Sequence, residues 1–196
     1  MKKSFLVLLL SPLFLLAQKS YQYSLSLNNV TNDQIHVTLV PPEIEGKEIK
    51  FSFPKIVPGT YSISDYGRFI ENFNAYDNKG IKIETQTSGL NAWIIDNTRG
   101  ISKIEYDLND TYDSKLDNPI FEPAGSDIEK DSIYMLNLHC LLGYFQNKME
   151  APIELTVQHP SMFYGSTSLV DKDPSTTTDV FVIENYNEAV DNPIMY

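Results

Sequence analysis

The sequence predicts a mainly β protein, an antiparallel β-sandwich with one or two short helices. Apolar and polar residues alternate over many short segments, and turn-forming residues separate those segments at a spacing of about ten residues. Helical periodicity is scarce by comparison. Of the 196 residues, 42% are hydrophobic and 12% aromatic, which excludes a disordered chain. A domain of this size can bury a core without disulfides, and the chain has a single cysteine.

Six segments alternate as half-buried strands do, and three more are apolar on both faces, as is typical of central strands. The alternating apolar positions are Tyr21, Tyr23, Leu25 and Leu27; Ile35, Val37 and Leu39; Ile49, Phe51 and Phe53; Ile81 and Ile83; Ile104, Tyr106 and Leu108; and Ile153, Leu155 and Val157. The continuous apolar segments are residues 92–95, 133–138 and 180–183. Turn signals between them are Asn28-Asn29, Pro41-Pro42, Asp77-Asn78-Lys79-Gly80, Arg99-Gly100 and Asp173-Pro174.

Two short segments have helical character. In residues 64–73, apolar side chains recur at helical spacing after the candidate N-cap Ser64, but Gly67 lies among them, so we expect a single helical turn that leads into a strand. Residues 139–144 are the second candidate. Residues 109–130 show little periodicity and many Asp, Pro and Gly, which predicts a long surface loop.

The first residues have the three-part pattern of a secretory signal peptide. Lys2 and Lys3 precede two apolar runs, and Ala17 then precedes a polar stretch. The apolar length falls short of the roughly 20 residues of a transmembrane helix. We therefore predict a signal peptide over residues 1–17, cleavage near Ala17, export to the periplasm or the extracellular space, and no stable membrane anchor.

Charge and motifs exclude several functions. A formal charge of −11 is unsuited to binding nucleic acid, which requires clustered Lys and Arg. His36, His139 and His159 form no H-E-x-x-H motif, so we expect each to be solvated or structural, and Cys140 to be a buried thiol. The acidic stretch of residues 107–118 lacks the glycine and the last glutamate of an EF-hand loop. It is interpreted as a solvated loop, with a looser calcium site left open.

One segment concentrates turn, aromatic and charged residues. In residues 53–77, the pair Pro58-Gly59 suits a type II turn, which would present the following residues rigidly. From spacing alone two interpretations remain: a sandwich corner with a buried Arg–Asp pair, or a recognition surface. The candidate residues are Pro58, Gly59, Tyr61, Asp65, Tyr66 and Arg68.

The same segment supports a family assignment. The stretch FPKIVPGTYSISDYGRFIENFNAYDNKG resembles the signature of the N-terminal domain of glycyl-aminopeptidase-like, PDZ-containing zinc metallopeptidases. The later stretch LLGYFQNKMEAPIELTVQHPSMFYGSTSL is similar to that family too. So is the final YNEAVDNPIMY, whose Tyr186, Asp191 and Pro193 match the link between domains.

The resemblance implies an enzyme in which a β-domain precedes a thermolysin-like zinc domain and a PDZ domain. This chain would then comprise a signal peptide (1–17), the N-terminal β-sandwich (18–185) and a link towards the catalytic domain (186–196). By resemblance it is not catalytic by itself, it needs no cofactor, and zinc is expected only in the catalytic domain. Its partners would be that domain of the same polypeptide and, indirectly, the peptide substrate.

The leading hypothesis is that the domain docks on the catalytic domain and forms one wall of its peptide cleft with the candidate residues around Pro58. In that role Asp65 would lie near the α-amine of the substrate, unless it pairs with Arg68. The alternative is a free-standing secreted module that binds a ligand such as a glycan through exposed tyrosines and Trp93.

Overall fold

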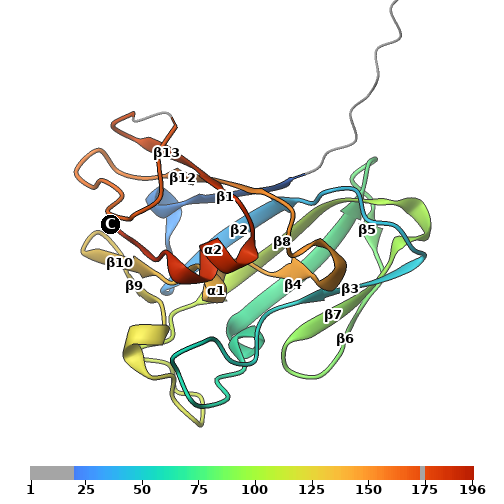
Figure 1. Ribbon diagram of the computed structural model, residues 1–196, viewed down its shortest axis with the longest axis horizontal. Helices are drawn as coiled ribbons and strands as arrows, with labels where there is room; N and C mark the ends of the chain where they lie inside the picture. The colour runs from blue at the N-terminus through green and yellow to red at the C-terminus, as the bar shows by residue number, and fades with distance from the viewer. Residues whose placement is uncertain (1–19, 173–174) are drawn as a thin grey trace, which may run out of the picture.

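The structure is a computed structural model that describes residues 20–172 and 175–196. The predicted signal peptide and the turn predicted at Asp173-Pro174 lie outside the described residues. A large twisted sheet and a smaller sheet face each other, and a third sheet lies at the end of the molecule near the C-terminus (Figure 1).

The large sheet has seven strands in the order β13-β12-β1-β2-β8-β4-β5. All neighbours are antiparallel except β1 and β12, which are parallel. In chain order these strands are β1 (Tyr21–Ser26), β2 (Gln34–Val40), β4 (Ile70–Asp77), β5 (Lys82–Ile83), β8 (Ile101–Asn109), β12 (Ile153–Gln158) and β13 (Thr178–Ile183).

The smaller sheets are antiparallel, with the orders β11-β3-β7-β6 and β14-β10-β9. Their strands are β3 (Glu48–Ser52), β6 (Thr85–Thr87), β7 (Ala92–Asp96), β9 (Asp127–Glu129), β10 (Ile133–Leu136), β11 (Tyr144–Phe145) and β14 (Ile194–Met195). Two short α-helices are described, α1 (Leu138–Leu141) and α2 (Tyr186–Asp191), with 3-10 turns at Leu27–Asn29, Tyr66–Phe69, Asn97–Arg99, Glu122–Ala124 and Gln146–Lys148.

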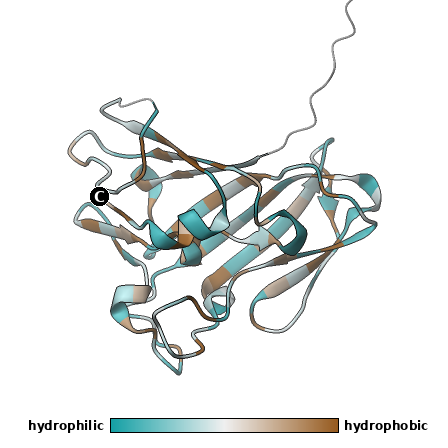
Figure 2. Ribbon diagram, in the orientation of Figure 1, coloured by the Kyte–Doolittle hydropathy of each residue, from teal (hydrophilic) through white to brown (hydrophobic). Residues whose placement is uncertain are grey.

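The predicted fold class and the alternating strands are confirmed. Every apolar position predicted to face inward is buried except Ile81, which precedes β5 and is exposed. The alternation of hydrophobic and hydrophilic residues along the strands is visible in Figure 2. Aromatic rings fill the space between the two larger sheets: Phe51 and Phe53 from the smaller sheet and its end pack on Tyr106 from the larger one, at centroid distances of 6.3 and 5.4 Å.

Three expectations need correction. Residues 180–183 lie in β13, which is the end strand of its sheet and not a central one, and the chain at Asp171 and Lys172 bonds to its outer side. The segment at residues 64–73 is a 3-10 turn followed by β4, as expected, but its N-cap is Asp65. The helix expected at residues 139–144 ends at Leu141, because the chain then enters β11.

Residues 186–196, which were expected to link the domain to the catalytic domain, are folded. Residues 186–196 form α2 and β14 and pack into the domain, where Tyr186, Ala189, Ile194 and Tyr196 are buried. These buried side chains pack the segment against the core of the domain.

Four tyrosine hydroxyls fix the backbone that leads into β11. Those of Tyr23, Tyr106 and Tyr186 donate to the carbonyls of Gly143, Leu141 and Leu142, and that of Tyr21 accepts from the amide of Phe145. Gly143 is required here, since a Cβ at that position would lie 2.3 Å from the Phe51 ring. This segment therefore holds Tyr144 in a fixed place at the surface.

Candidate functional site

The turn at Pro58-Gly59 is a type II turn, as the sequence predicts. Gly59 has φ +91°, and the Thr60 amide donates to the Val57 carbonyl at 3.3 Å. The Thr60 hydroxyl donates to the same carbonyl at 2.9 Å. Residues 54–64, the Pro-turn loop, are closed at the base because the amides of Ser64 and Asp65 both donate to the Lys55 carbonyl.

The Pro-turn loop presents apolar side chains to solvent. Tyr61 is 96% exposed, and Ile56 and Ile63 are about half exposed. Tyr61 and Asp65 also have left-handed backbone, with φ +56° and +51°, a conformation that costs a residue with a Cβ about 1–3 kcal/mol. Such outliers cluster where function requires a side chain in a particular place.

Asp65 does not pair with Arg68. Its Oδ1 accepts a hydrogen bond from Asn91 Nδ2 at 2.6 Å, and Asn91 Oδ1 accepts from the amide of Gly67 at 3.0 Å. Gly67 allows this approach, because a Cβ there would lie 2.5 Å from the Asn91 Cα. The Asp65 carboxylate is therefore oriented by the neutral amide of Asn91 and not by the guanidinium of Arg68.

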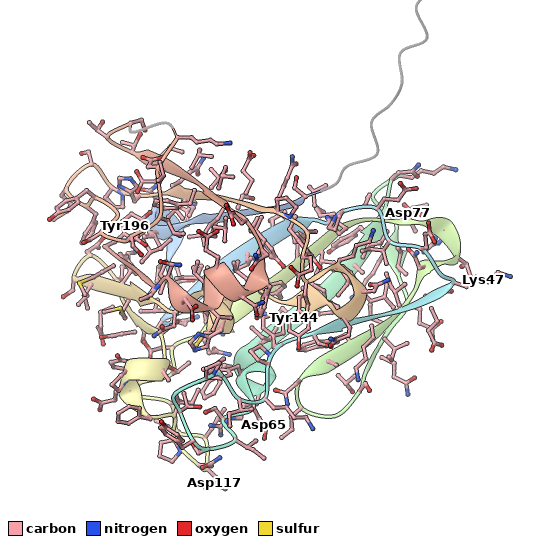
Figure 3. All side chains as sticks on the ribbon, viewed as in Figure 1. Lys47, Asp65, Asp77, Asp117, Tyr144 and Tyr196 are labelled. Atoms are coloured by element: carbon pink, nitrogen blue, oxygen red, sulfur yellow. The ribbon has the colours of Figure 1, made fainter. Side chains whose placement is uncertain are left out.

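Asp65 borders a polar groove of about 490 Å³ on the outer face of the β11-β3-β7-β6 sheet. The groove is also lined by Lys50, Lys55, Asn91 and Tyr144. Figure 3 labels Asp65 and Tyr144 on this side of the molecule, away from Tyr196. The groove thus combines an oriented carboxylate, two amines and an aromatic ring.

Arg68 has a structural role. Its Nε donates to the Ser64 carbonyl at 3.0 Å, its terminal nitrogens donate to the carbonyls of Asp117 and Asn118, and its guanidinium lies 4.6 Å from the centre of the Phe69 ring. It therefore ties residues 117–118 of the long loop to the 3-10 turn, and the interpretation as a buried Arg–Asp pair is wrong.

Tyr66 is fully buried against His139, with ring centroids 4.7 Å apart. Burial raises the pKa of Tyr66 to about 12 and lowers the pKa of the His139 imidazole. Of the six candidates in this segment, Tyr66 is inaccessible to a partner and Arg68 is occupied, while Pro58, Gly59, Tyr61 and Asp65 lie at the surface.

The structure brings residues of the candidate face around Pro58 together with residues of the predicted interdomain link. Pro58 from the Pro-turn loop and Tyr186 and Asp191 from α2 line one groove of about 380 Å³, together with Tyr144 and Met149. The Tyr144 and Tyr186 rings lie 4.6 Å apart. Pro193 is exposed and follows the end of α2. Tyr144 lines both grooves, so they adjoin.

Asn91 and Tyr144 are among the residues lining the grooves that were not candidates from the sequence. Tyr144 lies within the second stretch that carries the family resemblance, so that stretch contained a signal. Asn91 carried none, because its importance depends on contacts with Asp65 and Gly67 across 24 to 26 residues of chain.

The other candidate chemistry has structural roles. Cys140 is buried and free, and burial raises the pKa of its thiol to about 12. His36 Nδ1 lies 2.7 Å from Asp107 on the outer face of the large sheet, and His159 contacts Asp179. Within residues 20–172 and 175–196, no group of three or more His, Cys, Asp or Glu could hold a metal ion, so these residues do not fit zinc.

Two carboxylates of the acidic stretch at residues 107–118 already have partners. Asp107 pairs with His36 and accepts from Asn72, and Asp110 accepts from the amides of Tyr112 and Ile128.

Trp93, a candidate for glycan contact, is 9% exposed and stacks on Phe73 at 4.5 Å. It is therefore unable to stack on a sugar. No helix in the described part of the chain is long and apolar enough to cross a membrane.

Residues 22–196 match the family profile of the Peptidase M61 N-terminal domain. An aminopeptidase N family protein from Idiomarina loihiensis has a similar structure, with a TM-score of 0.76 and 18% identity; the match covers 89% of this chain and 29% of that protein. This chain thus spans less than a third of that relative.

Two further structures are more distantly similar. An M1 zinc metallopeptidase from Deinococcus radiodurans has a TM-score of 0.48 and 11% identity, with 91% of this chain and 41% of that chain covered. Yeast LTA4 hydrolase has a TM-score of 0.47 and 12% identity, with 91% and 28% covered. No curated protein sequence matches the chain.

Proposed function

The chain belongs to the Peptidase M61 N-terminal domain family, and from that premise we propose that it is the non-catalytic β-domain of an exported zinc metallo-aminopeptidase. In this role it docks on the catalytic domain of the same polypeptide and forms one wall of the peptide cleft. Zinc and the groups that activate water belong to the catalytic domain, and no step of hydrolysis is assigned to this chain.

The observation that carries the proposal is the Asp65 carboxylate. An aminopeptidase must recognise the cationic α-amine of its substrate, and a carboxylate that is already oriented forms a charge-assisted hydrogen bond with an amine at little entropic cost. Asn91 provides that orientation, and Arg68 does not neutralise the charge. The groove beside Asp65 leaves space for the first residues of a peptide.

The apolar surface beside Asp65 supports docking. The exposed side chains of Ile56, Tyr61 and Ile63 and the groove formed by Pro58 and α2 are adjacent along the Pro-turn loop. Contiguous exposed apolar residues with a polar rim are typical of protein interfaces. The catalytic domain would cover this surface and leave Asp65 at the edge of the cleft.

Export is a further part of the proposal. It rests on the basic residues, apolar runs and Ala17 at the start of the chain. Mass spectrometry of the secreted protein would find an N-terminus near residue 18. A mature protein that retained Met1 would contradict export by this signal.

The test of the cleft-wall role is Asp65→Asn in the full-length peptidase, assayed with peptides that have a free α-amine. We expect KM to rise by about tenfold, because loss of a charged hydrogen bond costs at least about 1.4 kcal/mol. Glu43→Gln, an exposed carboxylate away from both grooves, is the matched control and should leave KM unchanged.

A second measurement isolates the amine. The effect of Asp65→Asn should disappear with N-acetylated peptides, whose α-nitrogen carries no charge. If Asp65→Asn left KM for free peptides unchanged, or changed KM equally for both kinds of peptide, the proposed contact would be rejected.

A further inference from the structure

The last strand of the domain is bonded on both sides. The Met195 amide donates to the Ser166 carbonyl at 3.0 Å and the Ser166 amide donates to Met195 at 2.8 Å. On the other side, the amides of Tyr196 and Tyr134 donate to each other's carbonyls at 2.9 and 3.0 Å. β14 is the end strand of its sheet, and the chain at Ser166 bonds its outer side, so β14 is bonded on both sides.

A buried polar cluster holds the side chain of Tyr196. Its hydroxyl donates to Asp179 Oδ2 at 2.8 Å, and His159 Nε2 lies 3.4 Å from Asp179 Oδ1. The Tyr196 and His159 rings are 5.1 Å apart. All three residues are at most 7% exposed. One oxygen of the buried carboxylate thus accepts the Tyr196 hydroxyl, and the other faces the His159 ring without a hydrogen bond.

Gly165 closes the cluster. A Cβ at this position would lie 2.6 Å from Asp179 Oδ2 and 3.0 Å from the Tyr196 hydroxyl. Only a residue without a side chain lets the backbone pass so closely over the carboxylate. Four segments of the chain meet here: the end of β12, the start of β13, the loop at Gly165, and β14.

Hydrophobic burial alone does not account for this arrangement. A buried carboxylate is costly, and replacing such a cluster with well-packed apolar residues is often neutral or stabilising. An apolar ring would bury a similar area but would tolerate several orientations. The hydrogen bond to Asp179, in contrast, is satisfied in only one position of Tyr196 and so fixes the direction of the backbone.

We propose that Asp179 is a positioning residue: through the Tyr196 hydroxyl it fixes β14, and with it the direction in which the peptidase chain continues to its next domain. This inference rests on the proposed function for its consequence, but the local fixing of β14 is a property of this chain alone. The cluster would set how the Asp65 groove faces the catalytic domain.

The first test is Tyr196→Phe in this chain, followed by hydrogen exchange of individual amides. We expect the amides of Ser166, Met195 and residue 196 to exchange at least about tenfold faster, with the amides of β2 and β8 unchanged. Asp179→Asn should give the same local pattern. If no amide changes, or if those of β2 and β8 accelerate by the same factor, the positioning role is overturned.

His36→Gln is the matched control, because His36 also contacts an aspartate, Asp107, but on an exposed face. It should leave exchange in β14 unchanged. Accelerated exchange of β14 in this variant would overturn the assignment to Asp179.

The second test uses the full-length peptidase. Tyr196→Phe should raise KM severalfold with a smaller change in kcat, and small-angle scattering should show a broader distribution of interdomain distances. If β14 exchanges faster in the chain but KM and scattering are unchanged, the link to domain orientation is overturned while the proposed function stands. If Asp65→Asn left KM unchanged while Tyr196→Phe raised KM and broadened the interdomain distances, the cleft-wall role of Asp65 would be rejected and the positioning role of Asp179 would stand.

Discussion

The Pro-turn loop and residues 186–196 use the same kinds of residue in opposite ways. The loop places Ile56, Tyr61 and Ile63 in solvent, with Tyr61 on left-handed backbone, whereas the C-terminal segment buries Tyr186, Ile194 and Tyr196 against the core. The first region is a surface that a partner can cover, and the second is a support that fixes where the chain goes. Exposure of apolar residues therefore distinguishes recognition from anchoring within one small domain.

The largest effect should come from the C-terminal segment, residues 186–196, which anchors the end of the chain to the core and is called the anchor below. Tyr186→Ala removes a buried ring and its hydrogen bond to Leu142, and should lower the free energy of unfolding by about 3–5 kcal/mol. Tyr186→Phe, which removes only the hydroxyl, should cost about 1 kcal/mol. Chemical denaturation measures both. A loss below 1 kcal/mol for Tyr186→Ala would mean that α2 is not an anchor, and the comparison would fail.

High pH should weaken the anchor as well. Burial raises the pKa of Tyr186 and Tyr196 above the ordinary value of 10.0, so their phenols stay protonated in the folded state. The contribution of these two tyrosines to the free energy of unfolding is fully present below about pH 10. Above about pH 10 the free energy of unfolding falls by about 1.4 kcal/mol per pH unit for each tyrosine, because the unfolded chain releases those protons first. Unfolding followed from about pH 8 to about pH 11 tests this. Constant stability across that range would contradict the burial of these hydroxyls.

A smaller effect is expected at Arg68, which ties residues 117–118 to the 3-10 turn that follows the Pro-turn loop. Arg68→Ala removes the hydrogen bonds to the carbonyls of Ser64, Asp117 and Asn118, and should cost about 1 kcal/mol because the guanidinium is partly exposed. Limited proteolysis should then cut faster near residues 117–118. Lysine at this position should not restore protection, since it lacks the planar fork that reaches two carbonyls. If Arg68→Ala left residues 117–118 as resistant to proteolysis as before, Arg68 would not be needed to order that loop.

The smallest effect has the opposite sign. Tyr61→Gly should raise the free energy of unfolding by about 0.5 kcal/mol, because glycine adopts φ +56° without a Cβ penalty and Tyr61 buries almost nothing. In the full-length peptidase the same change should weaken docking, seen as easier dissociation or a raised KM. A loss of stability in the isolated chain would indicate that Tyr61 is held by contacts within the domain.

The strands were predictable because each alternating segment has its apolar face set by neighbours in sequence, as in β1, β2 and β8. Strands β6, β9 and β14 were not predicted, since each has only two or three residues and exists through its pairing with β7 or β10. The turn at Pro58-Gly59 followed from the fixed φ of proline and the freedom of glycine.

By itself, the sequence determined the fold class, the family resemblance and the turn that precedes Tyr61 and Asp65, because alternation and turn chemistry act over a few residues. Only the tertiary structure decided that Asp65 bonds to Asn91 and not to Arg68, that Pro58 meets Tyr186 and Asp191 at one groove, and that Asp179 holds Tyr196. These outcomes depend on which distant segments the folded sheets bring within hydrogen-bonding distance, and no local pattern encodes that.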